Sequence, residues 1–233
     1  MQSNATPASP PQTSHAPFWF GVAFCCLLIV SGSLLVSRSL KVRHPAAGSS
    51  LPRLCQVTGD LEATHRTGRT VRLSSLRGKV HTVAYLYTVC PHGCAAVIGE
   101  MLKLQRAHGA RGDFHQVSVT VLPGRDTAGM LDAYAKGIGL DSDAPWWFLT
   151  GEQSRLWDYM TDVLKLERAA TIPAEEQLNP LDTHSHDLRI VLLDREGYVR
   201  GYYSVFHPQK EIASLMCERL QQDARRLLDD PAL

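Results

Sequence analysis

The chain has 233 residues, of which 44% are hydrophobic and 20% are charged, and its formal net charge is +1. This length suits one globular domain that buries a core of ordinary size without disulfide staples. A near-neutral charge with no basic run excludes the electrostatic footprint of a nucleic-acid-binding protein, so we expect no nucleic-acid partner. Six cysteines are too few and too widely spaced for a disulfide framework.

An uncharged apolar stretch, FWFGVAFCCLLIVSGSLLV, runs from Phe18 to Val36. A helix of this length rises about 28 Å, close to the thickness of the hydrocarbon core of a bilayer. The residues before it lack the Lys or Arg of a signal peptide. We therefore expect an uncleaved transmembrane anchor at 18–36, between an N-terminal tail at 1–17 and a tether at 37–50.

The rest of the chain, residues 51–230, is expected to form one domain of short elements. The segment 56–73 predicts a hairpin with Gly68 near its turn, and VHTVAYLY at 80–87 predicts a buried central strand. Further elements are expected as a helix at 95–108, a strand at 114–122, a helix at 126–139 capped by Asp126, a strand at 146–151, a helix at 152–166, a strand–turn–strand at 188–203 turning at 195–197, and a closing helix at 207–230. This order predicts an α/β fold with a mixed sheet flanked by helices on both faces.

Two cysteines, Cys90 and Cys94 in CPHGC, come directly after the expected central strand and at the start of a helix. Residues four apart share one helical face, so their sulfurs can converge. A helix N-terminus favours thiolate, the form that binds soft metals and attacks disulfides. Pro91 suits the first helical turn. Ligands collect at the carboxyl ends of strands in such sheets, which favours a functional site here over two ordinary buried thiols.

A histidine is the expected third member of this site. Two thiolates alone hold Cu(I) linearly, whereas an added imidazole makes a trigonal site that also accepts Cu(II). The candidates are His184 and His186 in THSHDLRIVLLD, because they lie where the chain enters a predicted strand. His92 ranks below them, since its side chain is expected to point off the face that the thiols share. Either histidine alone is more often a solvated side chain than a ligand.

Five segments resemble the Sco/SenC family, thioredoxin-like proteins that deliver copper to cytochrome c oxidase. The segments are LPRLCQV, GRTVRLSSLRGKV, YTVCPHGC, SVTVLPGRDTAGMLDAYAKGIG and HSHDLRIVLLDREGYVRGYY, within roughly residues 51–228. The resemblance implies a thioredoxin-like domain after one transmembrane helix, with Cys90 and Cys94 as copper ligands and a redox pair. In the family the ligand histidine precedes the glycine of the next turn by eleven residues, which selects His186. His184 remains the rival, because it is the histidine followed by serine as in the family.

Two positions depart from the family pattern. Ala95 stands where the family usually has a second proline, and Leu122 replaces the acidic residue expected before Pro123. In the family that acidic residue is associated with the copper site or its reduction. The change at Leu122 touches neither the thiols nor the histidine. Cys55 and Cys217 are interpreted as structural cysteines.

These features predict a copper chaperone, carrying Cu(I) or Cu(II), for the binuclear copper centre of cytochrome c oxidase subunit II. Other copper-handling or thiol-redox proteins are the further expected partners. The alternatives are a membrane-anchored thiol–disulfide reductase, which would be an enzyme, a copper or redox sensor without transfer, and a peroxidase of the peroxiredoxin type. Leu122 is the feature that favours the sensor.

Two arguments bear on the side of the membrane on which the domain lies, and they point in opposite directions. Arg38, Lys41 and Arg43 come after the apolar stretch, and the positive-inside rule would keep the domain in the cytoplasm. The copper and thiol chemistry favours the opposite side. We expect a single-pass protein of a bacterial inner membrane with its domain in the periplasm.

Overall fold

The chain forms two compact units in the computed structural model, Met1–Ser49 and Ser50–Leu233. The structure describes residues 16–39, 51–91 and 93–230. Helix α1 (Ala16–Ser39) belongs to the first unit and confirms a helix over the apolar stretch. Most of the expected tail and tether lie outside the described residues. No helix among the described residues combines the length and the apolar composition that crossing a membrane requires.

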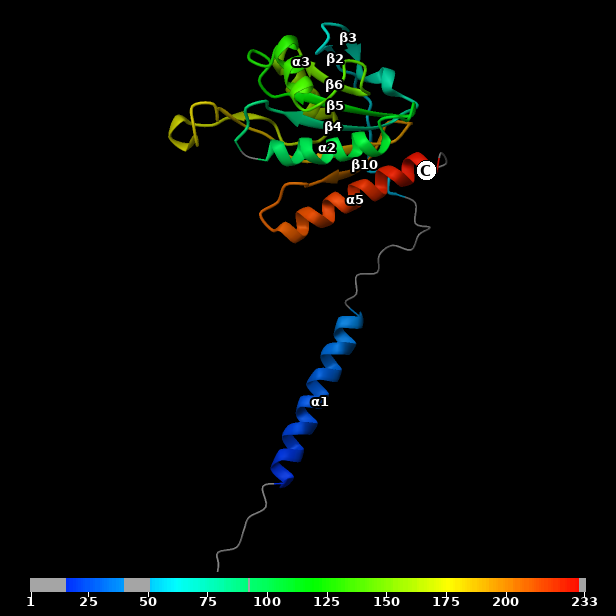
Figure 1. Cartoon of the computed structure of the whole chain (residues 1–233), viewed down its shortest axis with the longest axis vertical. Coiled ribbons are helices and arrows are strands. Elements are labelled where there is room, and N and C mark those ends of the chain that lie inside the picture. Colours follow the sequence, from blue (N-terminus) through cyan, green and yellow to red (C-terminus); the bar gives the residue numbers. More distant parts are fainter. Residues whose placement is uncertain (1–15, 40–50, 92, 231–233) are drawn as a thin grey trace, which may run out of the picture. The chain divides into compact units, whose positions relative to one another are not determined.

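The second unit is built on a mixed sheet of eight strands (Figure 1). Its strands, in spatial order, are β1 (Cys55–Gln56), β10 (Tyr198–Tyr203), β9 (Ile190–Leu193), β4 (Val80–Leu86), β5 (Phe114–Thr120), β6 (Trp146–Thr150), β2 (Glu62–His65) and β3 (Thr70–Arg72). Strand β4 pairs in parallel with β5, and β5 with β6, whereas the other neighbouring strands of this sheet are antiparallel. A separate two-stranded sheet joins β7 (Ala170–Thr171) to β8 (His184–Ser185).

Helices cover both faces of the large sheet, as the order of elements predicts. The helical segments are α2 (Cys94–His108), α3 (Ala128–Gly137), α4 (Gln153–Asp158), α5 (Lys210–Asp229), the 3₁₀ turns η1 (Leu73–Leu76) and η3 (Ala174–Glu176), and the π-helix η2 (Tyr159–Val163). Buried side chains of α2, α3 and α5 pack in one apolar core, and those of α4 and η2 pack in the other. Helices α2 and α5 lie side by side, joined by a 2.7 Å hydrogen bond from Gln221 to Glu100.

The central strand β4 has both of its faces in these cores. All seven of its residues are buried. Val80, Ala84 and Leu86 enter one core, while Val83 and Tyr85 enter the other, because alternate residues of a strand point to opposite faces. Burying a Val or Leu side chain fully contributes about 1.5–3 kcal/mol, so this strand is a main source of the fold's stability.

The structure differs from the sequence-based expectation at the start of α3. Asp126 was expected to cap the helix, but the N-cap is Thr127, whose hydroxyl accepts the N–H of Met130 at 3.4 Å. Asp126 is instead fully buried and accepts hydrogen bonds from Thr88 and Thr120. A buried carboxylate needs such donors, so the demand for partners overrides the local capping preference.

The helix expected at 152–166 also changes form. It begins as α4, continues as the π-helix η2, and ends near Lys165, which has a left-handed φ of 58°. The expected hairpin turns are confirmed, with Gly68 at φ +81° and Gly197 at φ +79°. Strands β7 and β8 were not predicted, because two-residue strands carry no periodic pattern.

Candidate metal centre

The two cysteines of the CPHGC segment lie where β4 gives way to α2. Strand β4 ends at Leu86, and a turn closed by the Cys90 N–H and the Tyr87 carbonyl, 3.0 Å apart, brings the chain round. Helix α2 then begins at Cys94, whose exposed fraction is 4%. Cys90 is half-buried, and neither cysteine forms a disulfide. The predicted strand-to-helix position of the pair is confirmed, while His92 lies outside the described residues.

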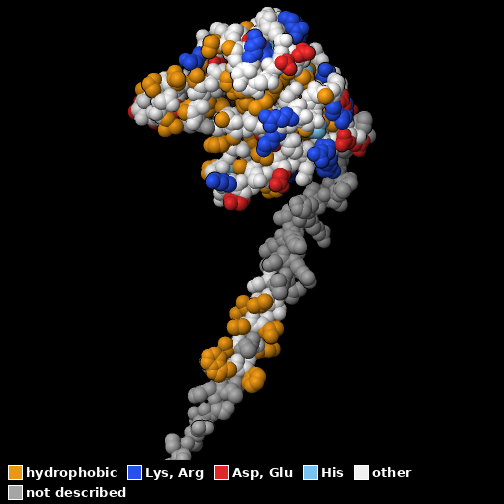
Figure 2. Space-filling view, viewed as in Figure 1, with side chains coloured by type: hydrophobic (Ala, Val, Ile, Leu, Met, Phe, Trp, Pro, Cys, Tyr) orange, Lys and Arg blue, Asp and Glu red, His pale blue; other side chains and the backbone are white. Residues whose placement is uncertain are grey.

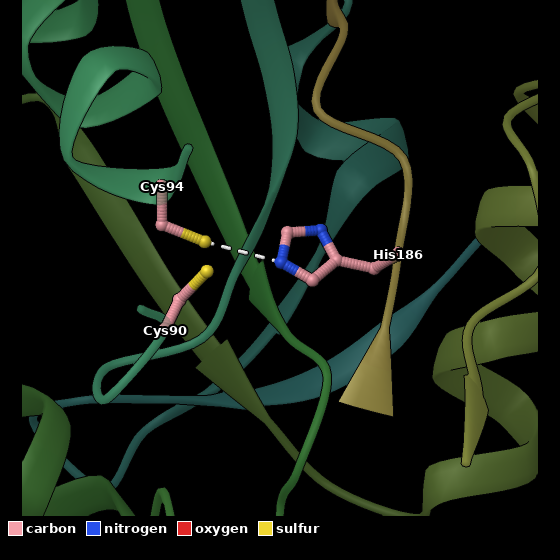
Figure 3. Close-up of side chains that lie close together, drawn as sticks. All are labelled: Cys90, Cys94 and His186. Carbon is pink, nitrogen blue, oxygen red and sulfur yellow. Dashed lines mark hydrogen bonds between the residues drawn. The ribbon is translucent and has the colours of Figure 1, made fainter. Parts of the chain in front are cut away.

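His186 reaches the same place from a distant part of the chain. Strand β9 runs antiparallel to β4, so the residues just before β9 pass the carboxyl end of β4. The Nε2 of His186 lies 3.1 Å from the Sγ of Cys94 (Figure 3). The donor atoms of Cys90, Cys94 and His186 all lie within 4.8 Å of one another. In the part of the chain that the structure describes, this is the group of three such side chains able to hold a metal, and His184 is not a member.

The ring of His186 is held in the orientation that a ligand needs. Its Nδ1 lies 2.9 Å from the carbonyl oxygen of Asp187, and a carbonyl can only accept. The Nδ1 therefore carries the proton, which leaves the lone pair of Nε2 facing the sulfur. The rings of Tyr85 and Tyr87 pack against the imidazole with centroids 5.8 and 6.5 Å away. The histidine is thus oriented by packing as well as by its hydrogen bond.

The carboxylate of Asp187, the residue after His186, holds two segments of backbone together. It accepts the backbone N–H groups of Glu167 and Arg189, each at 2.8 Å, and pairs with the Arg189 guanidinium. Burial raises the pKa of this carboxyl, but the bonds to Arg189 and Glu167 outweigh it and hold the pKa below its ordinary value. Asp187 stays charged and joins the segment before β7 to the segment that carries the histidine.

The protonation of Cys94 differs from the expectation. The helix N-terminus was expected to favour thiolate, but a hydrogen bond with Cys90, together with burial, raises the pKa of the Cys94 thiol. Without a metal the site therefore holds a neutral thiol at this position. A soft metal ion displaces that proton, which makes metal binding release protons.

A second polar network, which the sequence did not reveal, anchors the loop before Cys90. The Asp126 carboxylate accepts the Thr88 hydroxyl at 2.5 Å and the Thr120 hydroxyl at 2.6 Å. Thr88 lies in the turn after β4, and Thr120 ends β5. The carboxylate therefore ties the cysteine-bearing loop to the next strand of the sheet. The only local signal for this contact is that Thr88 and Thr120 lie at the carboxyl ends of two neighbouring strands.

A cavity of about 480 Å³ opens beside the three donors. Its lining includes Cys90, His184, His186 and Phe206, but not Cys94. Phe206, which follows β10, also lies against the cysteine segment, since a Cβ added at Gly93 would be 2.6 Å from its ring. Cys90 is thus the sulfur that an incoming group meets first. Burial, and then the neighbouring His186, lower the pKa of His184.

The remaining residues singled out from the sequence lie outside this group of donors. Leu122 packs at the edge of one apolar core, and Ala95 is exposed on α2. Cys55 is half-buried, with its sulfur 3.7 Å from the Tyr202 hydroxyl, and Cys217 is half-buried on α5. Their interpretation as structural cysteines stays a prediction.

The number and kind of these donor atoms limit which metal ion the site can bind. Two thiolates and one imidazole give three ligands, two of them soft, and this combination suits copper in either of its common oxidation states. Structural zinc takes four protein ligands in a tetrahedron, and three side chains do not complete one. The residues present therefore fit copper.

The fold and this site define a thioredoxin-like domain with a Cys–Cys–His candidate metal centre. A model of the SCO1/SenC family matches residues 52–221, and the chain belongs to this family. A SCO2-like protein of Rickettsia typhi is 26% identical over 182 residues, covering 76% of this chain and 86% of the relative.

Two solved structures have the same fold. ScoI of Bradyrhizobium japonicum, solved with copper bound, is 24% identical with a TM-score of 0.54, covering 69% of this chain and 97% of that one. BsSco, described as a Sco-family cytochrome c oxidase assembly protein with a disulfide switch, is 22% identical with a TM-score of 0.54. The match covers 76% of this chain and 98% of BsSco. These likenesses confirm the expected mixed α/β, thioredoxin-like fold.

Proposed function

We propose that this protein binds one copper ion through Cys90, Cys94 and His186 and delivers it to the binuclear copper centre of cytochrome c oxidase subunit II. The observation that carries the proposal is the convergence of three donor atoms within 4.8 Å. Membership of the SCO1/SenC family supports it, as does the copper bound by the Bradyrhizobium relative. The description of BsSco as an oxidase assembly protein supports the destination.

The three side chains divide the work of holding copper. The two cysteines bind copper as thiolates, and any thiol proton is released as the metal binds, while His186 offers the Nε2 lone pair. Cys94, which is 4% exposed, keeps its bond away from water. Cys90 lines the cavity, so its sulfur is the first to be exchanged for a donor of the acceptor.

Delivery is tested by mixing the copper-loaded full chain with the metal-free copper domain of oxidase subunit II. We expect the visible absorption of the binuclear centre to appear, and to be lost with the Cys90→Ala/Cys94→Ala double variant. Cys217→Ala is the matched control, because Cys217 is a half-buried cysteine outside the donor group, and it should transfer normally. Tight copper binding without transfer would support the sensor and reject the chaperone.

A thiol–disulfide reductase is the second candidate, favoured by two neighbouring cysteines that form no disulfide, one of which lines a cavity. In this reaction the Cys90 thiolate attacks a partner's disulfide and releases one partner thiol. Cys94 then attacks the mixed disulfide and releases the second, so two electrons and two protons pass to the partner. His186 is not needed for these steps.

The His186→Ala variant separates the two functions. If copper handling is the function, this variant loses copper affinity at least tenfold while its rate of disulfide exchange stays within about twofold. If copper binding is unchanged by the substitution, the Cys–Cys–His centre is rejected. The peroxidase hypothesis is tested by measuring hydrogen peroxide consumption in the presence of a thiol reductant. Catalytic consumption of peroxide would contradict the chaperone function.

Membrane attachment through α1 is part of the same proposal. The helix carries no charge from Phe18 to Val36, and apolar side chains such as Phe20, Phe24 and Ile29 are exposed along it (Figure 2). Exposed apolar side chains on a long helix favour burial in lipid or in a partner. We propose a single-pass protein of a bacterial inner membrane, with the domain in the periplasm. A periplasm-dependent reporter fused to the C-terminus should be active, and activity of a cytoplasm-dependent reporter would contradict this orientation.

A further inference from the structure

His184 is a histidine of the cavity that the three-donor centre does not use. It belongs to β8 and lines the same cavity as Cys90 and His186. Its ring and that of His186 both pack against Tyr87, with centroids 6.4 and 6.5 Å away. The two imidazoles therefore pack against one tyrosine and line one cavity with Cys90.

A chain of hydrogen bonds fixes which nitrogen of His184 is free. The Tyr87 hydroxyl donates to the carbonyl of Leu181, so its oxygen accepts the Thr183 hydroxyl at 2.9 Å. The Thr183 oxygen then accepts from His184 Nδ1 at 2.8 Å. Nδ1 is therefore the protonated nitrogen, which leaves the Nε2 lone pair of His184 available to a metal.

This arrangement repeats the one at His186, where a backbone carbonyl holds Nδ1 and presents Nε2. Metal-ligating histidines are commonly oriented in this way, with the ring nitrogen that does not bind the metal donating a hydrogen bond. The edge of the ring also packs against Trp157, with centroids 5.9 Å apart. His184 is therefore a half-buried, oriented imidazole, not a freely rotating surface side chain.

We propose that His184 Nε2 is a transit ligand, which holds Cu(I) together with Cys90 in the cavity before and after its stay in the three-donor centre. This inference rests on the proposed copper function. On loading, copper exchanges the His184 nitrogen for the Cys94 sulfur and the His186 nitrogen, and the Cys94 proton leaves to solvent. Release reverses these exchanges. Copper stays Cu(I) throughout, so no electron acceptor is required.

The position of the cysteines explains why a transit ligand is useful. Cys94 does not line the cavity and is nearly inaccessible, so an entering ion meets Cys90 first. One thiolate alone holds Cu(I) weakly, whereas a thiolate with an imidazole provides the two ligands that Cu(I) accepts. His184 supplies that second ligand on the cavity side.

The first test is the rate at which the full chain takes Cu(I) from its bicinchoninate complex, followed by stopped-flow absorbance. We expect His184→Ala to slow uptake at least tenfold while the final occupancy stays at one copper and the affinity within about threefold. His207→Ala is the matched control, because His207 is another partly exposed histidine that does not line the cavity, and its uptake should be normal.

Three results would overturn the proposal, and they differ in what they reject. Unchanged uptake by His184→Ala, with a wild-type chain that loads copper, rejects the transit role alone. Loss of equilibrium binding in this variant makes His184 a permanent ligand and also rejects it. A wild-type chain that takes up no copper rejects the copper function together with this inference.

A second variant tests the geometry without relying on rates. In Cys94→Ser the donors left beside the cavity are Cys90, His184 and His186. We expect its Cu(II) form to show one thiolate charge-transfer band and an electron paramagnetic resonance coupling from the His184 nitrogen. Adding His184→Ala should remove one nitrogen coupling. Identical spectra for the single and double variants would contradict a metal contact at His184.

Discussion

The Nε2 of His186 lies 3.1 Å from the Sγ of Cys94, although the two residues are 92 positions apart in the sequence. The contact depends on the sheet, because antiparallel β9 returns along β4 and carries His186 to the start of α2. The centre is therefore a product of the whole fold. Its ligands are tested best by changes that leave the sheet intact.

The two thiols of the metal-free centre should react at different rates. Cys90 is half-buried and lines the cavity, whereas Cys94 is 4% exposed and its pKa is raised by the hydrogen bond with Cys90 and by burial. We expect iodoacetamide to label Cys90 at least ten times faster than Cys94, measured by peptide mass spectrometry of the native chain. Copper should protect both thiols. Equal labelling rates would contradict the asymmetry.

The buried carboxylate of Asp126 should stabilise the loop that carries Cys90. In Asp126→Ala the hydroxyls of Thr88 and Thr120 lose their acceptor, at a cost of about 1–3 kcal/mol in the free energy of unfolding. Urea denaturation measures this loss, and copper affinity should fall as well. Asp143→Ala is the control, because Asp143 is exposed, and its stability should change by less than about 0.5 kcal/mol.

A double-mutant cycle checks that Asp126 acts through Thr88. If the two residues work together, Thr88→Val adds little to Asp126→Ala, with a coupling of about 0.5–3 kcal/mol. Fully additive losses would show that Asp126 stabilises the fold without holding this loop.

Close packing at Gly93 should make the start of α2 intolerant of a side chain. Gly93 has φ −102°, which alanine adopts readily, but its Cβ would lie 2.6 Å from the Phe206 ring and 2.7 Å from a methyl group of Leu188. We expect Gly93→Ala to weaken copper binding at least tenfold by displacing the Cys94 end of the helix. Calorimetric copper titration measures the effect.

Two variants show whether the clash is the cause. Phe206→Ala in the same chain should restore part of the affinity, because it removes one of the two close contacts and leaves that with Leu188. Gly99→Ala, on the same helix with no atom within 4 Å of the added Cβ, should leave binding unchanged. Failure of the Phe206 change to rescue Gly93→Ala would locate the effect elsewhere.

Buried histidines should make the domain sensitive to mild acid. Burial lowers the pKa of His81 to about 4 and that of His115 to about 3, so both rings are neutral in the folded chain at pH 5. The unfolded chain takes up protons near pH 6.5, so it is favoured as pH falls below that value. Each ring should lower the free energy of unfolding by about 2 kcal/mol between pH 7.5 and pH 5.

His65, whose pKa burial also lowers to about 4, adds a similar loss. Urea unfolding at several pH values measures the total, and His115→Gln should remove only the share of its own ring, about 2 kcal/mol. The loss should level off only below the folded pKa values. A stability that is flat between pH 7.5 and pH 5 would contradict neutral burial of these histidines.

Much of this structure follows from patterns in the sequence. The full burial of β4, the hairpin turns at Gly68 and Gly197, and the strand-to-helix position of Cys90 and Cys94 were all predictable, because each depends on local composition, periodicity or backbone conformation. The choice of His186 over His184 as the third donor needed the family resemblance. In the structure His186 lies with the two cysteines, within 4.8 Å of both sulfurs, and its binding of copper is the proposal made above.

Other features could not be read from local patterns. Asp126 has the sequence context of a helix cap, but its partners Thr88 and Thr120 come from two other segments. The raised pKa of Cys94 depends on burial and on Cys90, and both oppose the effect of the helix N-terminus. Contacts between distant segments decide such properties, and a single sequence does not encode them in any short pattern.

Copper K-edge X-ray absorption of the loaded full chain tests the central claim most directly, because it counts the atoms bound to the metal. If Cys90, Cys94 and His186 hold copper, the spectrum will fit two sulfur atoms and one nitrogen, and His186→Ala will lose the nitrogen. Copper bound without sulfur, or a spectrum unchanged in the Cys90→Ala/Cys94→Ala double variant, would contradict the account.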